Sequence, residues 1–143
     1  DANHSGYSDV QNISWGASQA ASISGGGGGS GKVSFSDLTV TAALDSATPA
    51  ILKMCASGKH ITNIKISICK AGGTQVEYST IVLKDVLVTG TQFVGASGGE
   101  TLGVNYSFQA AKVEHHYWVQ GKDGSKGAES QMGWDVKQNI ATA

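Results

Sequence analysis

The sequence predicts a mainly β protein, an antiparallel barrel or two-sheet sandwich with one short flanking helix. Two observations point to this class. Apolar and polar residues alternate with a period of two along most of the chain, as in strands that bury one face. Gly accounts for 20 of the 143 residues and Pro for only one, and glycine-rich stretches separate many of the alternating segments. We expect one domain over residues 1–143.

The first alternating segment covers residues 10–15. Strict alternation would place Val10, Asn12 and Ser14 on one face and Ile13 and Trp15 on the other. Between residues 32 and 44 the apolar positions change parity, from Val33 and Phe35 to Leu38, Val40 and Ala42. This change predicts a β-bulge at Ser36 and Asp37.

The remaining strands follow from the same pattern. Residues 64–69 and 76–82 alternate on either side of a turn at 71–74, which predicts a hairpin. Further strands are expected near residues 86–88, 102–108, 113–119 and 132–136, with glycine-rich loops between them.

One segment departs from the strand pattern. Thr48 offers a hydroxyl for a helix cap, Pro49 suits the first turn, and Gly58 can adopt the left-handed conformation that ends a helix. Apolar residues between them recur at helical spacing. We therefore expect a single helix at about residues 48–57.

Composition excludes several function classes. Charged residues make up only 15%, the net charge is -1 and all ten cations are Lys, so the chain lacks the basic field that binds nucleic acid. No apolar run is long enough to insert into a membrane, and the polar start is unlike a cleavable signal peptide. Low charge favours association with other chains.

Two short strings resemble catalytic motifs, but the secondary structure expected after each of them does not fit the motif. Residues 26–32 match most of a phosphate-binding loop, but a strand rather than a helix is expected to follow. Ser97 lies in a G-x-S-x-G string that is also followed by a strand, not by the helix of a nucleophile elbow. We therefore expect neither a catalytic residue nor a cofactor.

The histidines and cysteines give no metal site. His115 and His116 are adjacent on an expected strand, so they point to opposite faces, and Glu114 with His116 indicates a solvated strand face. His60 follows the glycine that ends the helix, where a cation suits the helix dipole. Cys55 and Cys69 are expected to be free, buried thiols.

A set of short motifs recurs in this order in one family: SWGASQ at 14–19, GKV at 31–33, DSATP at 45–49, CASGKH at 55–60, KAGG at 70–73, VEY at 76–78, LKDVLV at 83–88, GGE at 98–100 and GWD at 133–135. Through them the chain resembles Hcp, the haemolysin-coregulated protein family of type VI secretion systems. The motifs extend over nearly the whole chain, so together they are far more specific than any one of them.

The resemblance implies a β-barrel with a flanking helix that forms hexameric rings and no catalytic activity. The rings would stack into a tube that carries small effectors in its lumen, with a spike protein at its tip and a contractile sheath around it. The tube protein would reside in the bacterial cytoplasm before it is expelled into the medium or a target cell. The resemblance also implies an extended apolar first strand, which would precede residue 1 of the given sequence.

Two sets of site residues follow from the resemblance. It places residues 12–15 near the lumen, and the alternation then makes Ser14 and Asn12 the candidate contacts to cargo. The loop of residues 20–31 is the candidate stacking or inter-subunit arm, with its core at Ser24, Gly25, Gly26, Gly27, Gly28, Gly29, Ser30 and Gly31. The alternative function is a secreted β-domain that acts as a binding module or adhesin subunit without forming rings; an enzyme ranks below both.

Overall fold

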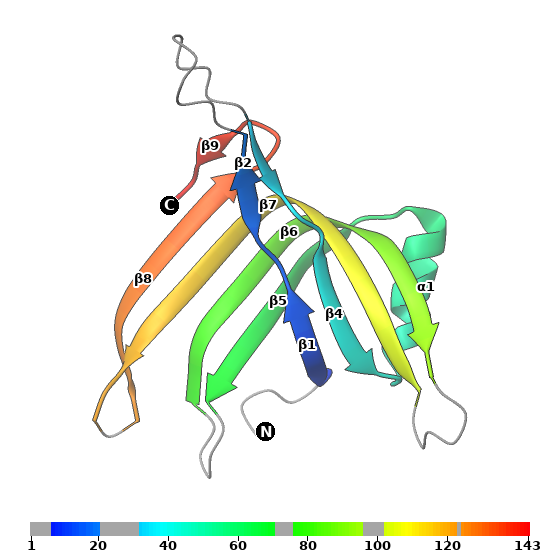
Figure 1. Cartoon of the computed structure of the whole chain (residues 1–143), viewed down its shortest axis with the longest axis horizontal. Helices are drawn as coiled ribbons and strands as arrows, with labels where there is room; N and C mark the ends of the chain where they lie inside the picture. Colours follow the sequence, from blue (N-terminus) through cyan, green and yellow to red (C-terminus); the bar gives the residue numbers. More distant parts are fainter. Residues whose placement is uncertain (1–6, 21–31, 71–75, 96–101, 123) are drawn as a thin grey trace. The chain divides into compact units, whose positions relative to one another are not determined.

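The computed structural model describes residues 7–20, 32–70, 76–95, 102–122 and 124–143. It confirms a mainly β protein with antiparallel sheets and one short helix (Figure 1). The described residues form two compact units. Unit 1 comprises Tyr7, His60–Val86 and Ala110–Ala143, and unit 2 comprises Ser8–Lys59 and Leu87–Gln109.

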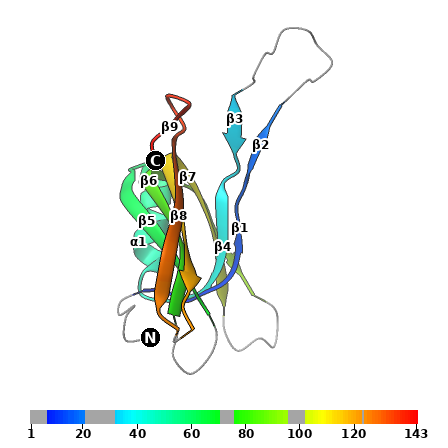
Figure 2. The ribbon, with the colours of Figure 1, turned by 90° about the vertical axis from the view of Figure 1, so that its left-hand side faces the viewer.

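Unit 2 contains the first four strands and the helix. Strands β1 (Val10–Ser14) and β4 (Leu38–Ala43) pair with each other, and β4 pairs with the first part of β7 (Gly103–Gln120). Strands β2 (Ala17–Gln19) and β3 (Val33–Phe35) form a separate two-stranded sheet. Figure 2 shows this short pair side by side, beyond the ends of β1 and β4.

The core of unit 2 follows the alternation of the sequence. Leu38, Val40 and Ala42 of β4 are buried, and each lies opposite a buried residue of β7: Phe108, Tyr106 and Val104. Val88 of β6 (Val76–Val94) is also buried. One face of this sheet therefore supplies the apolar side chains of the core.

Two expectations about these strands were wrong. The expected bulge at Ser36 and Asp37 is instead a break between β3 and β4, which belong to different sheets. A register shift does occur in β1, between Val10 and Asn12. As a result Val10 lies opposite Ala42 and shares the face of Ile13, rather than that of Asn12 and Ser14.

The helix α1 (Thr48–Ser57) has the expected bounds, but its start is built differently. Ala47 is the N-cap, and no side chain caps the helix. The Thr48 side chain is buried instead, where its Oγ1 accepts a hydrogen bond of 2.8 Å from the hydroxyl of Tyr106. At the other end Gly58 has a φ of 69° and its N–H donates to Met54, as expected of a left-handed cap.

Unit 1 contains β5 (Ile61–Lys70), the first part of β6, the second part of β7, β8 (Lys126–Asp135) and β9 (Ile140–Ala141). The strands are hydrogen-bonded in the order β5, β6, β7, β8, β9. β5 and β6 pair antiparallel, which confirms the expected hairpin, although its turn lies outside the described residues. Ile81, Leu83, Val86 and Val113 form the core of this unit.

The long strands β6 and β7 correct the expectation of separate short strands. β7 continues from Gly103 to Gln120 without the expected loop, and β6 from Val76 to Val94. In β7 the buried apolar positions are even-numbered up to Phe108, and the next one is Val113. The parity changes where the strand passes from one unit to the other, so the pattern resembled two strands.

Candidate functional site

Unit 2 carries a neutral polar face on the side of the sheet opposite its core. We call it the amide-hydroxyl face, and it consists of Asn12, Ser14, Thr39, Thr41, Asn105 and Ser107. The pairing of β1, β4 and β7 brings these side chains to one side, because Asn12 lies opposite Thr41 and Ser14 lies opposite Thr39. Thr41 and Thr39 lie in turn opposite Asn105 and Ser107.

Both candidate cargo residues lie on this face. Asn12 and Ser14 are exposed, and Thr39, Thr41, Asn105 and Ser107 are half-buried. The Thr41 hydroxyl donates a hydrogen bond of 2.8 Å to Oδ1 of Asn105, which joins β4 to β7 across the face. The surface therefore offers hydroxyl and amide groups without formal charge.

The candidate stacking loop, Ser24 to Gly31, lies outside the described part of the chain. The flanking strands β2 and β3 pair antiparallel from Gln19 and Val33 onward. Residues 26–32 are therefore followed by the strand β3. A phosphate-binding loop would be followed by a helix, so this string is not such a loop. Ser97 also lies outside the described residues.

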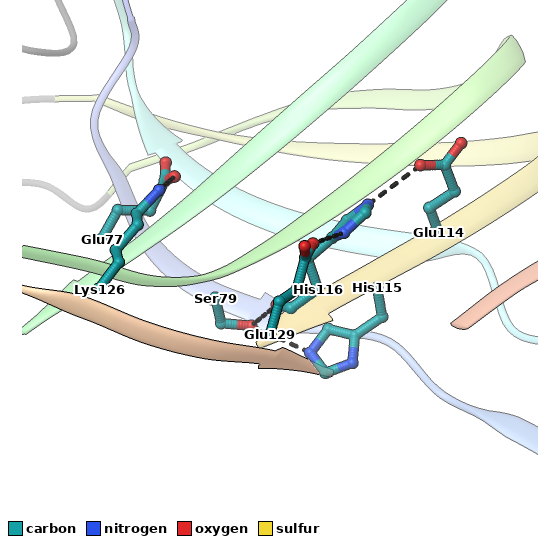
Figure 3. A network of polar contacts seen from close by, with 7 residues as sticks. All are labelled: Glu77, Ser79, Glu114, His115, His116, Lys126 and Glu129. Carbon is teal, nitrogen blue, oxygen red and sulfur yellow. Dashed lines mark hydrogen bonds and ion pairs between the residues drawn. The ribbon is translucent and has the colours of Figure 1, made fainter. Parts of the chain in front are cut away.

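Unit 1 carries a network of charges of which the sequence indicated only the shared strand face of Glu114 and His116 (Figure 3). Nε2 of His116 lies 3.0 Å from Glu114, and Nδ1 lies 2.8 Å from Glu129 on the neighbouring strand β8. Glu114 is also 2.7 Å from Lys84 of β6. Because both ring nitrogens face carboxylates, only the imidazolium form can donate both hydrogen bonds. We call this arrangement the His116 clamp.

The clamp alters the ionisation of its members. Hydrogen bonds from Lys84 and His116 lower the pKa of Glu114. Hydrogen bonds to Glu114 and Glu129 raise the pKa of His116 above its ordinary value of 6.5. The side chain of His116 is only 17% exposed, so the expected solvated strand face is instead a partly buried ion-pair network across three strands.

The raised pKa of His116 predicts how stability depends on pH. The stabilisation by the imidazolium is fully present below pH 6.5 and declines as the pH rises through the raised pKa. We expect His116→Gln to cost about 1 kcal/mol of unfolding free energy at pH 6 and much less at pH 9. Urea unfolding of both proteins across this range checks it. An equal cost at both values would contradict the clamp.

A second set of contacts surrounds Glu77, whose side chain is only 11% exposed. It accepts hydrogen bonds from Ser67 of β5 and, at 2.9 Å, from Lys126 of β8. The Lys126 amine also lies 4.0 Å from the ring centroid of Trp118, which stacks on His116. These contacts further tie β8 to the sheet of unit 1.

The Ser79 and His115 pair resembles a catalytic dyad but is arranged differently. Nε2 of His115 lies 3.0 Å from the Ser79 hydroxyl, and this hydroxyl donates to the carbonyl of His116. The carbonyl can only accept, so it competes with the imidazole for the hydroxyl proton. Ser79 is also buried, out of reach of a substrate.

His60 and the two cysteines are the remaining side chains with possible chemical reactivity. His60 pairs with Asp85 at 2.7 Å, rather than acting only on the helix dipole. Cys55 and Cys69 are free as expected, but half-buried rather than buried. Within the described ranges no group of three or more His, Cys, Asp or Glu side chains could hold a metal ion. Among these residues, likewise, no helix is long and apolar enough to cross a bilayer.

Comparisons with known proteins identify a family. A family model described as "Type VI secretion system effector, Hcp" matches residues 1–115. The chain is 43% identical over 111 residues to Protein hcp1 of Pseudomonas aeruginosa, an alignment that covers 76% of this chain and 68% of that protein.

Solved structures agree with the sequence match. The fold is similar to Hcp1 from Salmonella typhimurium, with a TM-score of 0.81, 27% identity and coverage of 99% of this chain and 88% of that one. It is also similar to a type VI secretion system effector from Yersinia pestis, with a TM-score of 0.75, 29% identity and coverage of 95% and 89%.

Proposed function

Because the chain belongs to the Hcp family of type VI secretion proteins, we propose that it is a subunit of the inner tube, in which hexameric rings stack end to end. The family match over residues 1–115 is the observation that carries this proposal. Hcp is a family of structural tube proteins, so this chain is a structural protein and not an enzyme.

The surface chemistry supports a repeating subunit. A closed ring needs two complementary side patches, and stacking needs two more, so much of a small subunit becomes interface. Interfaces are depleted in charge, and only 15% of this sequence is charged. In unit 2, Leu44, Phe93 and Leu102 are exposed apolar side chains, as expected of surfaces that other copies cover.

The oligomeric state tests the tube directly. We expect negative-stain microscopy of the purified protein to show six-fold rings, and light scattering to give the mass of a hexamer. A monomer at high concentration would overturn the tube and favour a binding module or adhesin subunit that does not form rings.

The proposal extends to cargo carriage, in which the amide-hydroxyl face lines the lumen. Its exposed Asn12 and Ser14 would contact small effectors, because neutral hydroxyl and amide groups form hydrogen bonds with many partners. A spike protein, a contractile sheath and passage from the bacterial cytoplasm to a target cell complete the proposed role. The loop with Ser24 and Gly31 remains the proposed stacking arm.

Enlarging Ser14 tests the lumen face. We expect Ser14→Gln to leave rings intact and to reduce retention of a co-expressed small effector by about fivefold, because a longer side chain displaces the bound surface. Pull-down of the effector on tagged rings measures it. The matched control is Ser18→Gln, the same change on the exposed strand β2. Equal retention by both variants would remove Ser14 from the cargo surface.

A further inference from the structure

Unit 1 contains an open cavity of about 500 Å³. Side chains from four strands and the following turn line it: Thr62 of β5, Lys84 and Asp85 of β6, Lys112 of β7, and Asp135 of β8 with Lys137 after it. Its volume lies within the usual range of small-molecule sites. Because all of these residues belong to unit 1, the cavity is formed within that unit.

Both carboxylates of the cavity have partners within the protein. One oxygen of Asp85 pairs with His60 at 2.7 Å and the other lies 3.6 Å from Lys137. Asp135 is buried, and its Oδ1 accepts the backbone N–H of Gln138 at 2.9 Å. These carboxylates are therefore held by groups of the protein itself.

The donors of the cavity are in excess. Lys112 lies opposite Asp135 in the register of β7 and β8, yet its amine has no ion pair or hydrogen bond within the described residues. Among the described residues, the hydroxyl of Thr62 and the side-chain amide of Gln138 also have no hydrogen-bond partner. Lys84 and Lys137 add two further ammonium groups to the lining, and these already pair with Glu114 at 2.7 Å and with Asp85 at 3.6 Å.

A cavity lined by three ammonium groups and two carboxylates, in which the Lys112 amine has no protein partner among the described residues, favours a ligand that accepts hydrogen bonds. We propose that it binds a small multivalent oxyanion, either phosphate or a polycarboxylate. Lys112, Lys84 and Lys137 would supply charge, and Thr62 and Gln138 would supply neutral hydrogen bonds. Because the chain contains no Arg, the ligand is held by ammonium point charges and not by a guanidinium fork.

The test uses the full chain, labelled with ¹⁵N and titrated with inorganic phosphate or with citrate. Each titration is compared with KCl at the same ionic strength, since salt alone screens exposed lysines. We expect saturable shifts of the backbone amides of Lys84, Asp85, Lys112 and Lys137 with at least one oxyanion. Binding of phosphate alone or citrate alone identifies which chemistry the site prefers, and binding of neither overturns the proposal.

Removal of one amine localises the site. We expect Lys112→Gln to weaken binding about tenfold, the loss of one charge-assisted hydrogen bond. Lys53→Gln on the exposed face of α1 removes the same charge in unit 2 and should leave the affinity unchanged. Equal affinities of the two variants, or shifts that KCl reproduces, would overturn the proposed site. This outcome is independent of ring formation, which light scattering reports separately.

Discussion

Replacing Leu38 by Ala is expected to lower the free energy of unfolding by about 3 kcal/mol. The Leu38 side chain is fully buried in unit 2 and lies opposite Phe108. Its truncation removes apolar contacts and leaves a cavity that a sheet, held in register by its hydrogen bonds, cannot easily close. Urea unfolding followed by circular dichroism measures the loss.

The matched control for this change is Leu52→Ala in α1. Leu52 is 42% exposed, and Ala is a good helix former, so we expect a change within about 0.5 kcal/mol. If both variants lost the same stability, the assignment of Leu38 to the core would be wrong.

Replacing Gly127 by Ala is the second change with a large expected effect. A Cβ at this position would lie 2.6 Å from the carbonyl oxygen of Val119, on the strand paired with β8. Backbone of a paired strand cannot move aside without loss of ladder hydrogen bonds. We therefore expect a loss of about 2 kcal/mol.

Gly16→Ala separates this clash from the general effect of removing a glycine. A Cβ at Gly16 would meet nothing within 4 Å, so the substitution should be neutral or stabilising by up to about 1 kcal/mol. Thermal unfolding of both variants gives opposite signs if the contact with Val119 matters. A neutral Gly127→Ala would mean that β7 and β8 approach less closely than described.

Local patterns predicted most of the fold. Alternation identified Leu38, Val40 and Ala42 as one face of a buried strand, and the spacing of Pro49 and Gly58 identified the helix. Both features depend on interactions between residues that are close in the sequence, so they can be predicted without a structure.

Features that depend on distant residues could not be predicted. Thr48 looked like a cap because its true partner, Tyr106, lies 58 positions away. Val10 was assigned to the wrong face because a register shift leaves no mark on the pattern. The same holds for the His116 clamp, since Lys84 and Glu129 come from two other strands.

The lumen assignment is a separate case. The sequence suggested Asn12 and Ser14 only through resemblance, and the pairing of β1 with β4 added Thr39 and Thr41 beside them. Polar residues on an exposed strand are too common to mark a site by themselves. The other four residues of the face could have been found from one signal. The alternate positions in residues 39–41 and 105–107 are all polar and uncharged.

The absence of charge on the amide-hydroxyl face would also determine how a molecule binds to it and leaves it. Its six side chains carry no formal charge, so they exert no long-range attraction that dissolved salt could screen. Capture would depend on high local concentration rather than on electrostatic steering. Release would follow from dilution alone, at any ionic strength, without a change in the chemistry of the surface.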